Sequence, residues 1–213
     1  MKKINFIFCL HNHQPVGNFD HVFEEAYQKS YKPFLEVAKA HPRIKISYHN
    51  TGILYDWFEE KHPKFIEQIS EMTKSGQLEL LTSGYYEPIL AIIPDRDKVG
   101  QIKKHKEYLK KRFNYEAGGL WLAERVWEQH IVKQIAEAGI RYVVIDDTHF
   151  KYAGFKDSEL RGYYRTEEQG SLLHIFPIKK KLRYTIPFQP IPDTFEYLSS
   201  IATEEGLDVA VSA

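Results

Sequence analysis

Ionisable side chains that could do chemistry occur directly after several short apolar segments. His11 and His13, for example, follow the apolar segment Ile4–Leu10. The ionisable residues in such positions are His11, His13, His49, Glu87, Glu124, Asp146 and Asp147. Parallel strands end at one edge of a sheet or barrel, and such folds build their sites at that edge. We therefore predict that these side chains share one pocket.

Glu124 has the most unusual surroundings of this set. It follows the apolar segment Leu120–Leu122 and lies between Trp121 and Trp127. A carboxylate next to a buried strand is costly unless it is paired or used in chemistry. The tryptophans are expected to pack in the core, although Trp121 is also a candidate platform for a sugar ring. Glu79 lies inside another apolar segment, and for the same reason we assign it to the pocket.

The elements that would position these residues are short strands alternating with helices. The predicted strands are Ile4–Leu10, Ile44–Tyr48, Leu78–Leu81, Leu120–Leu122, Tyr142–Ile145, Leu172–Phe176 and Leu207–Val211. The predicted helices are Val22–Ala40, Gly52–Glu60, Pro63–Ser75, Asp95–Phe113, Gln129–Ala138 and Asp193–Ile201. This alternation predicts βαβ units and a largely parallel sheet, hence an α/β fold. Residues Thr148–Gly170 show no clear period and are expected to form a long loop over one face.

The composition excludes several classes of function. The 213 residues contain 29 Lys and Arg and 29 Asp and Glu, so no net charge attracts nucleic acid or an anionic membrane. The apolar run near the N-terminus is too short for a signal peptide, and no run approaches membrane-spanning length. Cys9, the only cysteine, is expected to be a buried hydrophobe rather than a catalytic thiol. We therefore expect a cytoplasmic, reducing location.

Three motifs give the sequence a resemblance to glycoside hydrolase family 57, the α-amylase and 4-α-glucanotransferase family common in thermophiles. They occur in the order and at the spacing of that family, and the similarity covers the whole chain. The motifs are His13-Gln14-Pro15, Gly76-Gln77-Leu78-Glu79-Leu80-Leu81 and Trp121-Leu122-Ala123-Glu124-Arg125-Val126. Ala123 stands where Thr is commoner in the family.

The resemblance implies a (β/α)7-type barrel, an incomplete relative of the eight-fold TIM barrel. It also implies a retaining reaction on α-1,4-glucans or maltooligosaccharides, without a catalytic metal or organic cofactor. Glu124 matches the family's nucleophile. Four further residues match positions that line the donor-sugar site, namely His11, His13, Glu79 and Trp121. The resemblance does not separate hydrolase from transferase or give a chain-length preference.

The residues agree with this interpretation on chemical grounds. Retention needs two carboxyl groups about 5–5.5 Å apart, one attacking the anomeric carbon and one transferring the proton. His11 and His13, two residues apart on an extended segment, can face the same side and hydrogen-bond to sugar hydroxyls. Arg125 is expected to point away from Glu124 and to pair with an acid behind the site.

The family's general acid/base is an Asp that follows a late strand, and here it is expected directly after Ala213. Residues 1–213 are therefore expected to be the N-terminal portion of the barrel, truncated before the acid/base and with little or no turnover alone. A truncated barrel would leave an open sheet edge, which favours self-association.

Two alternatives remain open on the sequence. A zinc-dependent deacetylase or amidohydrolase could use His11 and His13, with His49 and Asp146 or Asp147 as further ligands. The chain could also be a non-catalytic carbohydrate-binding remnant.

Overall fold

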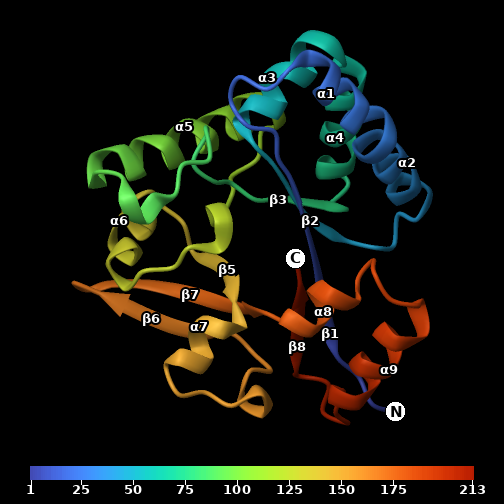
Figure 1. Cartoon of the computed structure of the whole chain (residues 1–213), viewed down its shortest axis with the longest axis vertical. Coiled ribbons are helices and arrows are strands. Elements are labelled where there is room, and N and C mark those ends of the chain that lie inside the picture. The colour runs from blue at the N-terminus through green and yellow to red at the C-terminus, as the bar shows by residue number, and fades with distance from the viewer.

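Seven parallel strands form the centre of the computed structural model, which describes all of residues 1–213 (Figure 1). An eighth strand, β6, pairs antiparallel with β7. The strands are β1 (Asn5–Asn12), β2 (Ile46–Asn50), β3 (Leu78–Leu80), β4 (Gly119–Trp121), β5 (Tyr142–Asp146), β6 (Tyr164–Glu168), β7 (Ser171–Ile178) and β8 (Val209–Ser212). All seven predicted strands are found, with ends shifted by a few residues.

The parallel strands close into a barrel. Their hydrogen-bonded order is β3-β2-β1-β8-β7-β5-β4, and the two ends of this row meet at a bridge between Thr82 and Leu120. There the Thr82 N–H donates to the Gly119 carbonyl at 3.0 Å, and the Trp121 N–H donates to the Thr82 carbonyl at 2.7 Å. The predicted (β/α)7-type barrel is confirmed. The open edge is not found, because β8 fills the place between β7 and β1, so the reason given for self-association does not hold.

Helices surround the barrel on its outside (Figure 1). Every predicted helical segment is helical, and the first contains a π-helical turn at Tyr27–Tyr31 between α1 and α2. The α-helices are α1 (Asp20–Ala26), α2 (Lys32–Ala40), α3 (Gly52–Lys61), α4 (Pro63–Lys74), α5 (Asp95–Phe113), α6 (Val132–Glu137), α7 (Asp147–Tyr152), α8 (Lys180–Thr185) and α9 (Ile191–Ile201). None of them is both long and apolar enough to cross a membrane.

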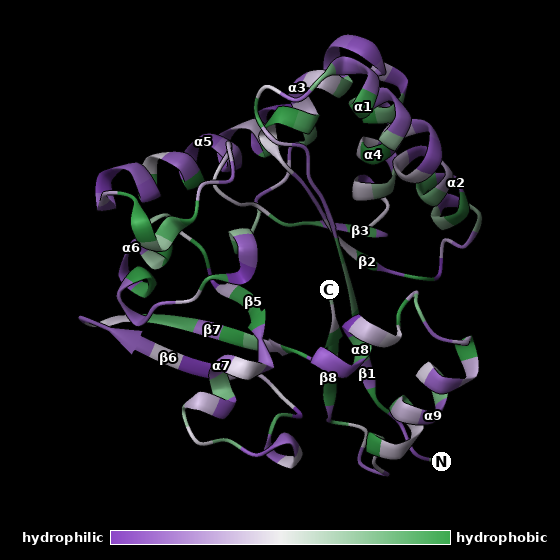
Figure 2. Cartoon of the chain, viewed as in Figure 1, coloured by the Kyte–Doolittle hydropathy of each residue, from purple (hydrophilic) through white to green (hydrophobic).

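The helices form where apolar residues recur with helical spacing. In α4 the side chains of Phe65, Ile66, Ile69 and Met72 are buried while the intervening charged residues face solvent. The chain then leaves the helix through Gly76, whose φ of +74° suits glycine and stops the helix there. Figure 2 shows the same division, with hydrophilic residues on the outer faces of α1, α2 and α5 and hydrophobic ones along much of β7.

Parts of the segment expected to be a loop have regular structure. Residues Asp147–Tyr152 form α7, and Tyr164–Glu168 form β6. Both are short, and β6 is rich in charge, so neither gives a periodic apolar pattern. The prediction of one long loop over Thr148–Gly170 was therefore wrong, because pairing with β7 supplies the order that the β6 sequence does not indicate.

The parallel barrel brings the carboxyl ends of its strands to one edge. His11 and Asn12 at the end of β1 lie in register with His49 and Asn50 at the end of β2. Below this edge, a small apolar cluster inside the barrel contains Cys9, Leu81, Trp121, Val144, Ile178 and Val211. The cluster supports the polar residues at the edge from beneath.

Cys9 is expected to be unreactive until the protein unfolds. Its residue is 1% exposed, and burial, with a smaller effect of Glu79, raises the pKa of the thiol to about 12 from 9.0. Such a shift lowers the thiolate fraction about 10³-fold near neutral pH. A disulfide reagent such as DTNB should therefore label the native chain at least about 10³-fold more slowly than the urea-unfolded chain. Comparable rates in the two states would contradict this burial.

Candidate active site

A buried carboxylate joins the two histidines at the end of β1. Glu87, on the loop after β3, has a side chain that is 4% exposed. One carboxylate oxygen, Oε1, lies 3.3 Å from Nε2 of His11, and the other, Oε2, is hydrogen-bonded to Nδ1 of His13. The backbone of Glu87 has a φ of +54°, a left-handed conformation that is uncommon for residues other than glycine. The chain therefore has a strained turn at Glu87, the residue whose carboxylate contacts both histidines.

His11 is fixed on all sides. Its ring stacks on Trp121, with ring centroids 4.3 Å apart and the planes 15° from parallel. Its Nδ1 lies 2.8 Å from Nδ1 of His49, so one of the two rings donates a hydrogen bond to the other. Trp121 is 2% exposed, and His11 covers one face of its ring. The predicted grouping of His11, His13 and Trp121 is present in the structure.

The two histidines of this group differ in protonation. Burial, helped by the nearby charges of His13 and Arg125, lowers the pKa of His11 to about 3, so this ring is neutral near pH 7. The hydrogen bond that His13 donates to Glu87 raises the pKa of His13 above its ordinary value. Burial raises the pKa of Glu87 as well. The group therefore contains a neutral imidazole, that of His11, and a second imidazole, that of His13, which holds its proton more firmly.

Glu124 is exposed at the edge of this group, in a short 3-10 turn after β4. Its carboxylate is close enough to raise the pKa of His13, after the larger effect of Glu87 on that ring. It also raises the pKa of Glu87, after the larger effect of burial. Glu124 has a φ of +51° and the next residue, Arg125, a φ of +55°. Two consecutive left-handed residues are costly, and such strain clusters at functional sites.

Arg125 turns away from Glu124 and pairs with an acid, as expected. Its Nε lies 3.2 Å from a carboxylate oxygen of Asp146, and Nη1 of Arg183 donates to the same carboxylate at 3.0 Å. The expected reason, an extended chain, is wrong, because the turn at Glu124 is left-handed. Two guanidinium groups thus hold Asp146, while Asp147 pairs with Lys151 at 3.2 Å.

These pairings change the predicted zinc site. Neither Asp146 nor Asp147 belongs to a group of convergent metal-ligand atoms. The group that converges is His11, His13 and Glu87, whose ligand atoms all lie within 4.8 Å of one another.

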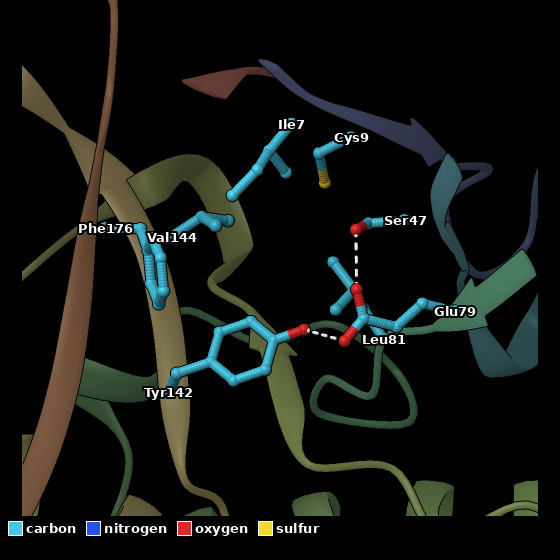
Figure 3. A pocket seen from close by; sticks show the side chains of 8 residues that line it. All are labelled: Ile7, Cys9, Ser47, Glu79, Leu81, Tyr142, Val144 and Phe176. Carbon is cyan, nitrogen blue, oxygen red and sulfur yellow. Dashed lines mark hydrogen bonds between the residues drawn. The ribbon is translucent and has the colours of Figure 1, made fainter. Parts of the chain in front are cut away.

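Glu79 lies in a different layer of the barrel from the two histidines. It is in register with Ser47, which is in register with Cys9, two residues before His11 on β1. Its carboxylate accepts hydrogen bonds from Ser47 Oγ at 2.7 Å and from the Tyr142 hydroxyl. Figure 3 shows this carboxylate in a cavity of about 200 Å³ whose remaining lining is apolar apart from Ser47 and the Tyr142 hydroxyl. Glu79 thus contacts neither histidine, and the structure gives its charge two hydroxyl donors.

The roles of three residues at or near the site were not predicted from the sequence. Glu87 was one of several acids at strand ends, and nothing in its sequence surroundings marked it as the partner of both histidines. Arg183 lies on α8, a helix of six residues that is too short to show a period. His105 sits on the buried face of α5, where helical spacing predicts core packing. Its Nδ1 accepts a hydrogen bond from the backbone N–H of Ser83 at 3.1 Å, on the loop that leads to Glu87.

Removal of the left-handed strain at Glu124 should raise stability. Glycine adopts this conformation freely, so Glu124→Gly should have a free energy of unfolding higher than that of Glu124→Gln by about 1 kcal/mol. Both variants lack the carboxylate, so urea unfolding compares the backbone alone. The control pair is Glu128→Gly and Glu128→Gln, at a residue whose φ is −136°. At this position the glycine variant should have the lower free energy of unfolding. Equal free energies of unfolding for the two Glu124 variants would contradict the claim that the left-handed backbone at this residue is strained.

Acid should destabilise the protein partly through His105. Burial lowers the pKa of this ring to about 3, below an unfolded value near 6.5. Between these values the unfolded chain binds a proton that the folded chain does not, so stability is lost as the pH falls below about 6.5. The loss approaches about 1.4 kcal/mol per pH unit. His105→Asn retains a hydrogen-bond acceptor, and urea unfolding should show a shallower pH slope. His41→Asn, at an exposed position, is the control, and an unchanged slope for His105→Asn would contradict this assignment.

Comparison with known proteins gives consistent results along the chain. The sequence pattern described as Glycosyl hydrolase family 57 matches residues 7–211. An α-amylase of Pyrococcus horikoshii is 49% identical over 99% of this chain, and a 4-α-glucanotransferase of Thermococcus litoralis is 48% identical over the same share. The crystal structure of the 4-α-glucanotransferase from T. litoralis superimposes on the whole chain with a TM-score of 0.97.

The match covers only part of these relatives. The chain spans 33% of the P. horikoshii protein and 32% of the T. litoralis protein. Within this span, the family pattern, the sequence identity and the barrel agree. The chain belongs to glycosyl hydrolase family 57.

Proposed function

We propose that this chain carries the nucleophile side of a retaining active site that acts on α-1,4-glucans, with Glu124 as the nucleophile. The observation that carries the proposal is the position of Glu124. It is the exposed carboxylate beside the group of His11, His13 and Glu87, while Asp146 and Asp147 at the same edge are held by cations. An attacking carboxylate must be ionised and reachable, and Glu124 meets the second condition by its exposure.

In the proposed reaction, a carboxylate oxygen of Glu124 attacks the anomeric carbon of a glucosyl unit. The C1–O bond to the leaving sugar breaks as the new C1–O bond to Glu124 forms, and the leaving oxygen takes the bonding electron pair and a proton from a general acid. Water then releases the sugar in a hydrolase, whereas a sugar hydroxyl releases it in a 4-α-glucanotransferase. The known relatives include both kinds.

The histidines support this step by binding the sugar in one orientation. His13 is partly exposed and holds its proton through Glu87, so its free ring nitrogen can donate to a sugar hydroxyl. His11 is held in place by its contacts with Trp121, His49 and Glu87. Its ring therefore cannot shift to fit a sugar that is bound in another orientation. A donor beside a fixed ring holds the anomeric carbon within reach of the nucleophile.

The general acid/base is assigned to a part of the protein that these residues do not cover. Among the acids at this edge, Asp146 and Asp147 are paired with cations and Glu87 is buried between histidines. The relatives are about three times as long as the chain. A residue directly after β8 would emerge at the same edge as His11, since β8 pairs in parallel with β1. We infer that the proton-transferring Asp enters there and that residues 1–213 alone turn over natural glucans about 10²–10⁴-fold more slowly than an enzyme that has it.

The proposal is tested with a substrate that needs no general acid. In α-maltosyl fluoride the leaving group is fluoride, which departs with the electron pair of the C1–F bond and needs no proton. Glu124 alone could therefore form the glycosyl-enzyme. The 213-residue chain should gain the mass of one maltosyl group in intact-mass spectrometry, and peptide mapping should place that group on Glu124. Hydrolysis of the adduct should be slow, because no base activates water.

The controls separate chemistry from folding. Glu124→Gln should give no adduct, whereas the neighbouring exposed Glu128→Gln should label like the native chain. Circular dichroism should show both variants folded. An adduct on another carboxylate, or no adduct on the folded native chain, would rule out Glu124 as the nucleophile.

A further inference from the structure

We propose that His11, His13 and Glu87 form a binding site for a divalent transition-metal ion, with Zn²⁺ as the best match, and that this ion and a glucan exclude each other. The metal site is inferred from geometry alone. The mutual exclusion rests in addition on the proposed function, since it assumes that the sugar contacts the same histidines.

The positions of the ligand atoms suit a tetrahedral ion. The ring nitrogens of His11 and His13 and the carboxylate of Glu87 lie within 4.8 Å of one another. With bonds of about 2.1 Å, neighbouring ligand atoms of tetrahedral zinc are about 3.4 Å apart. Nε2 of His11 and Oε1 of Glu87 are already separated by 3.3 Å. His13 has to move outward, away from its direct hydrogen bond with Glu87, and its side chain is 41% exposed and has room to do so.

One ligand atom is left without a hydrogen bond. Oε1 of Glu87 is buried, since the side chain is only 4% exposed, and it accepts no hydrogen bond of good geometry. A buried carboxylate oxygen without a donor costs free energy. It faces Nε2 of His11, so a cation between these two atoms would satisfy both.

The surroundings of His11 also fit a metal ligand. Its Nδ1 is hydrogen-bonded to His49, and its ring is stacked on Trp121. When Nδ1 donates to His49, the lone pair of Nε2 points into the group. A hydrogen bond at the second nitrogen and a fixed ring plane are the usual support of a metal-bound histidine.

The ligand types select the metal. Two imidazoles and one carboxylate form a three-ligand zinc set with an open fourth position, whereas Mg²⁺ and Ca²⁺ require mainly oxygen ligands. The fourth position would take water. The ion occupies space beside the nucleophile, and the outward shift of His13 moves its ring from the position in which it donates to a sugar hydroxyl. The ion would therefore act as a reversible inhibitor rather than as a cofactor.

Calorimetry on the metal-free 213-residue chain tests the site directly. Titration with ZnCl₂ near neutral pH should give one ion per chain, and Co²⁺ should give the visible absorption of a tetrahedral complex. His13→Ala and Glu87→Gln each remove a ligand and should weaken binding by at least about 100-fold, the upper range seen when a supporting residue is lost. His41→Ala and Glu107→Gln, at exposed positions outside the site, should bind like the native chain.

The outcomes are decisive in both directions. Absence of binding, or equal binding by the native chain and both ligand variants, would overturn the site. If the ion does bind, saturating Zn²⁺ should suppress labelling of Glu124 by α-maltosyl fluoride in the native chain, and removal of the ion with EDTA should restore it. Unchanged labelling would overturn the mutual exclusion. If the native chain cannot be labelled at all, the proposed function fails, while calorimetry still decides whether the metal site exists.

Discussion

The closure of the barrel between β3 and β4 is the constraint on which the site depends. Thr82 exchanges two backbone hydrogen bonds with Gly119 and Trp121, and this pairing joins the last open edges of the sheet. It places the indole of Trp121 against His11 across the inside of the barrel. The turn that carries Glu124 starts two residues later. This short bridge closes the barrel on the side where β4 would otherwise be joined to β1 only through β5, β7 and β8.

Backbone strain is concentrated near this bridge. Glu87, Glu124 and Arg125 have left-handed backbones, and the carboxylate of Glu87 is buried between imidazoles. The helices of the outer ring show ordinary packing, as in α4, where apolar side chains face the core. Costly conformations persist only when the surrounding structure enforces them. The apolar cluster beneath the site, with Cys9, Leu81 and Trp121 among its members, supplies that rigid support.

The sequence predicted the barrel and the members of the site better than it predicted their contacts. Strands of the barrel are short apolar runs, and their order fixes which polar residues reach the edge, so His11, His13 and Glu124 could be named in advance. Glu87 was named among the pocket residues, but its contact with both histidines was not predicted, because it reaches them through a strained loop whose path no local pattern records. Arg183 and β6 were missed for a related reason, since their order comes from Asp146 and from β7 rather than from their own segments.

The acids near the edge of the barrel differ in the cations and hydrogen-bond donors that contact them. This difference determines which of them can act as a nucleophile. Asp146 has two guanidinium groups, Asp147 has Lys151, and Glu79 has two hydroxyl donors in the layer below. A carboxylate that is held by cations or hydrogen-bond donors is a weaker nucleophile, because its lone pairs are already engaged. Arg125 is the nearest cation in sequence to Glu124, and the left-handed turn directs it to Asp146 instead. The strain at this turn therefore has a chemical consequence, since it leaves Glu124, which is exposed beside the histidines, free of a neutralising partner.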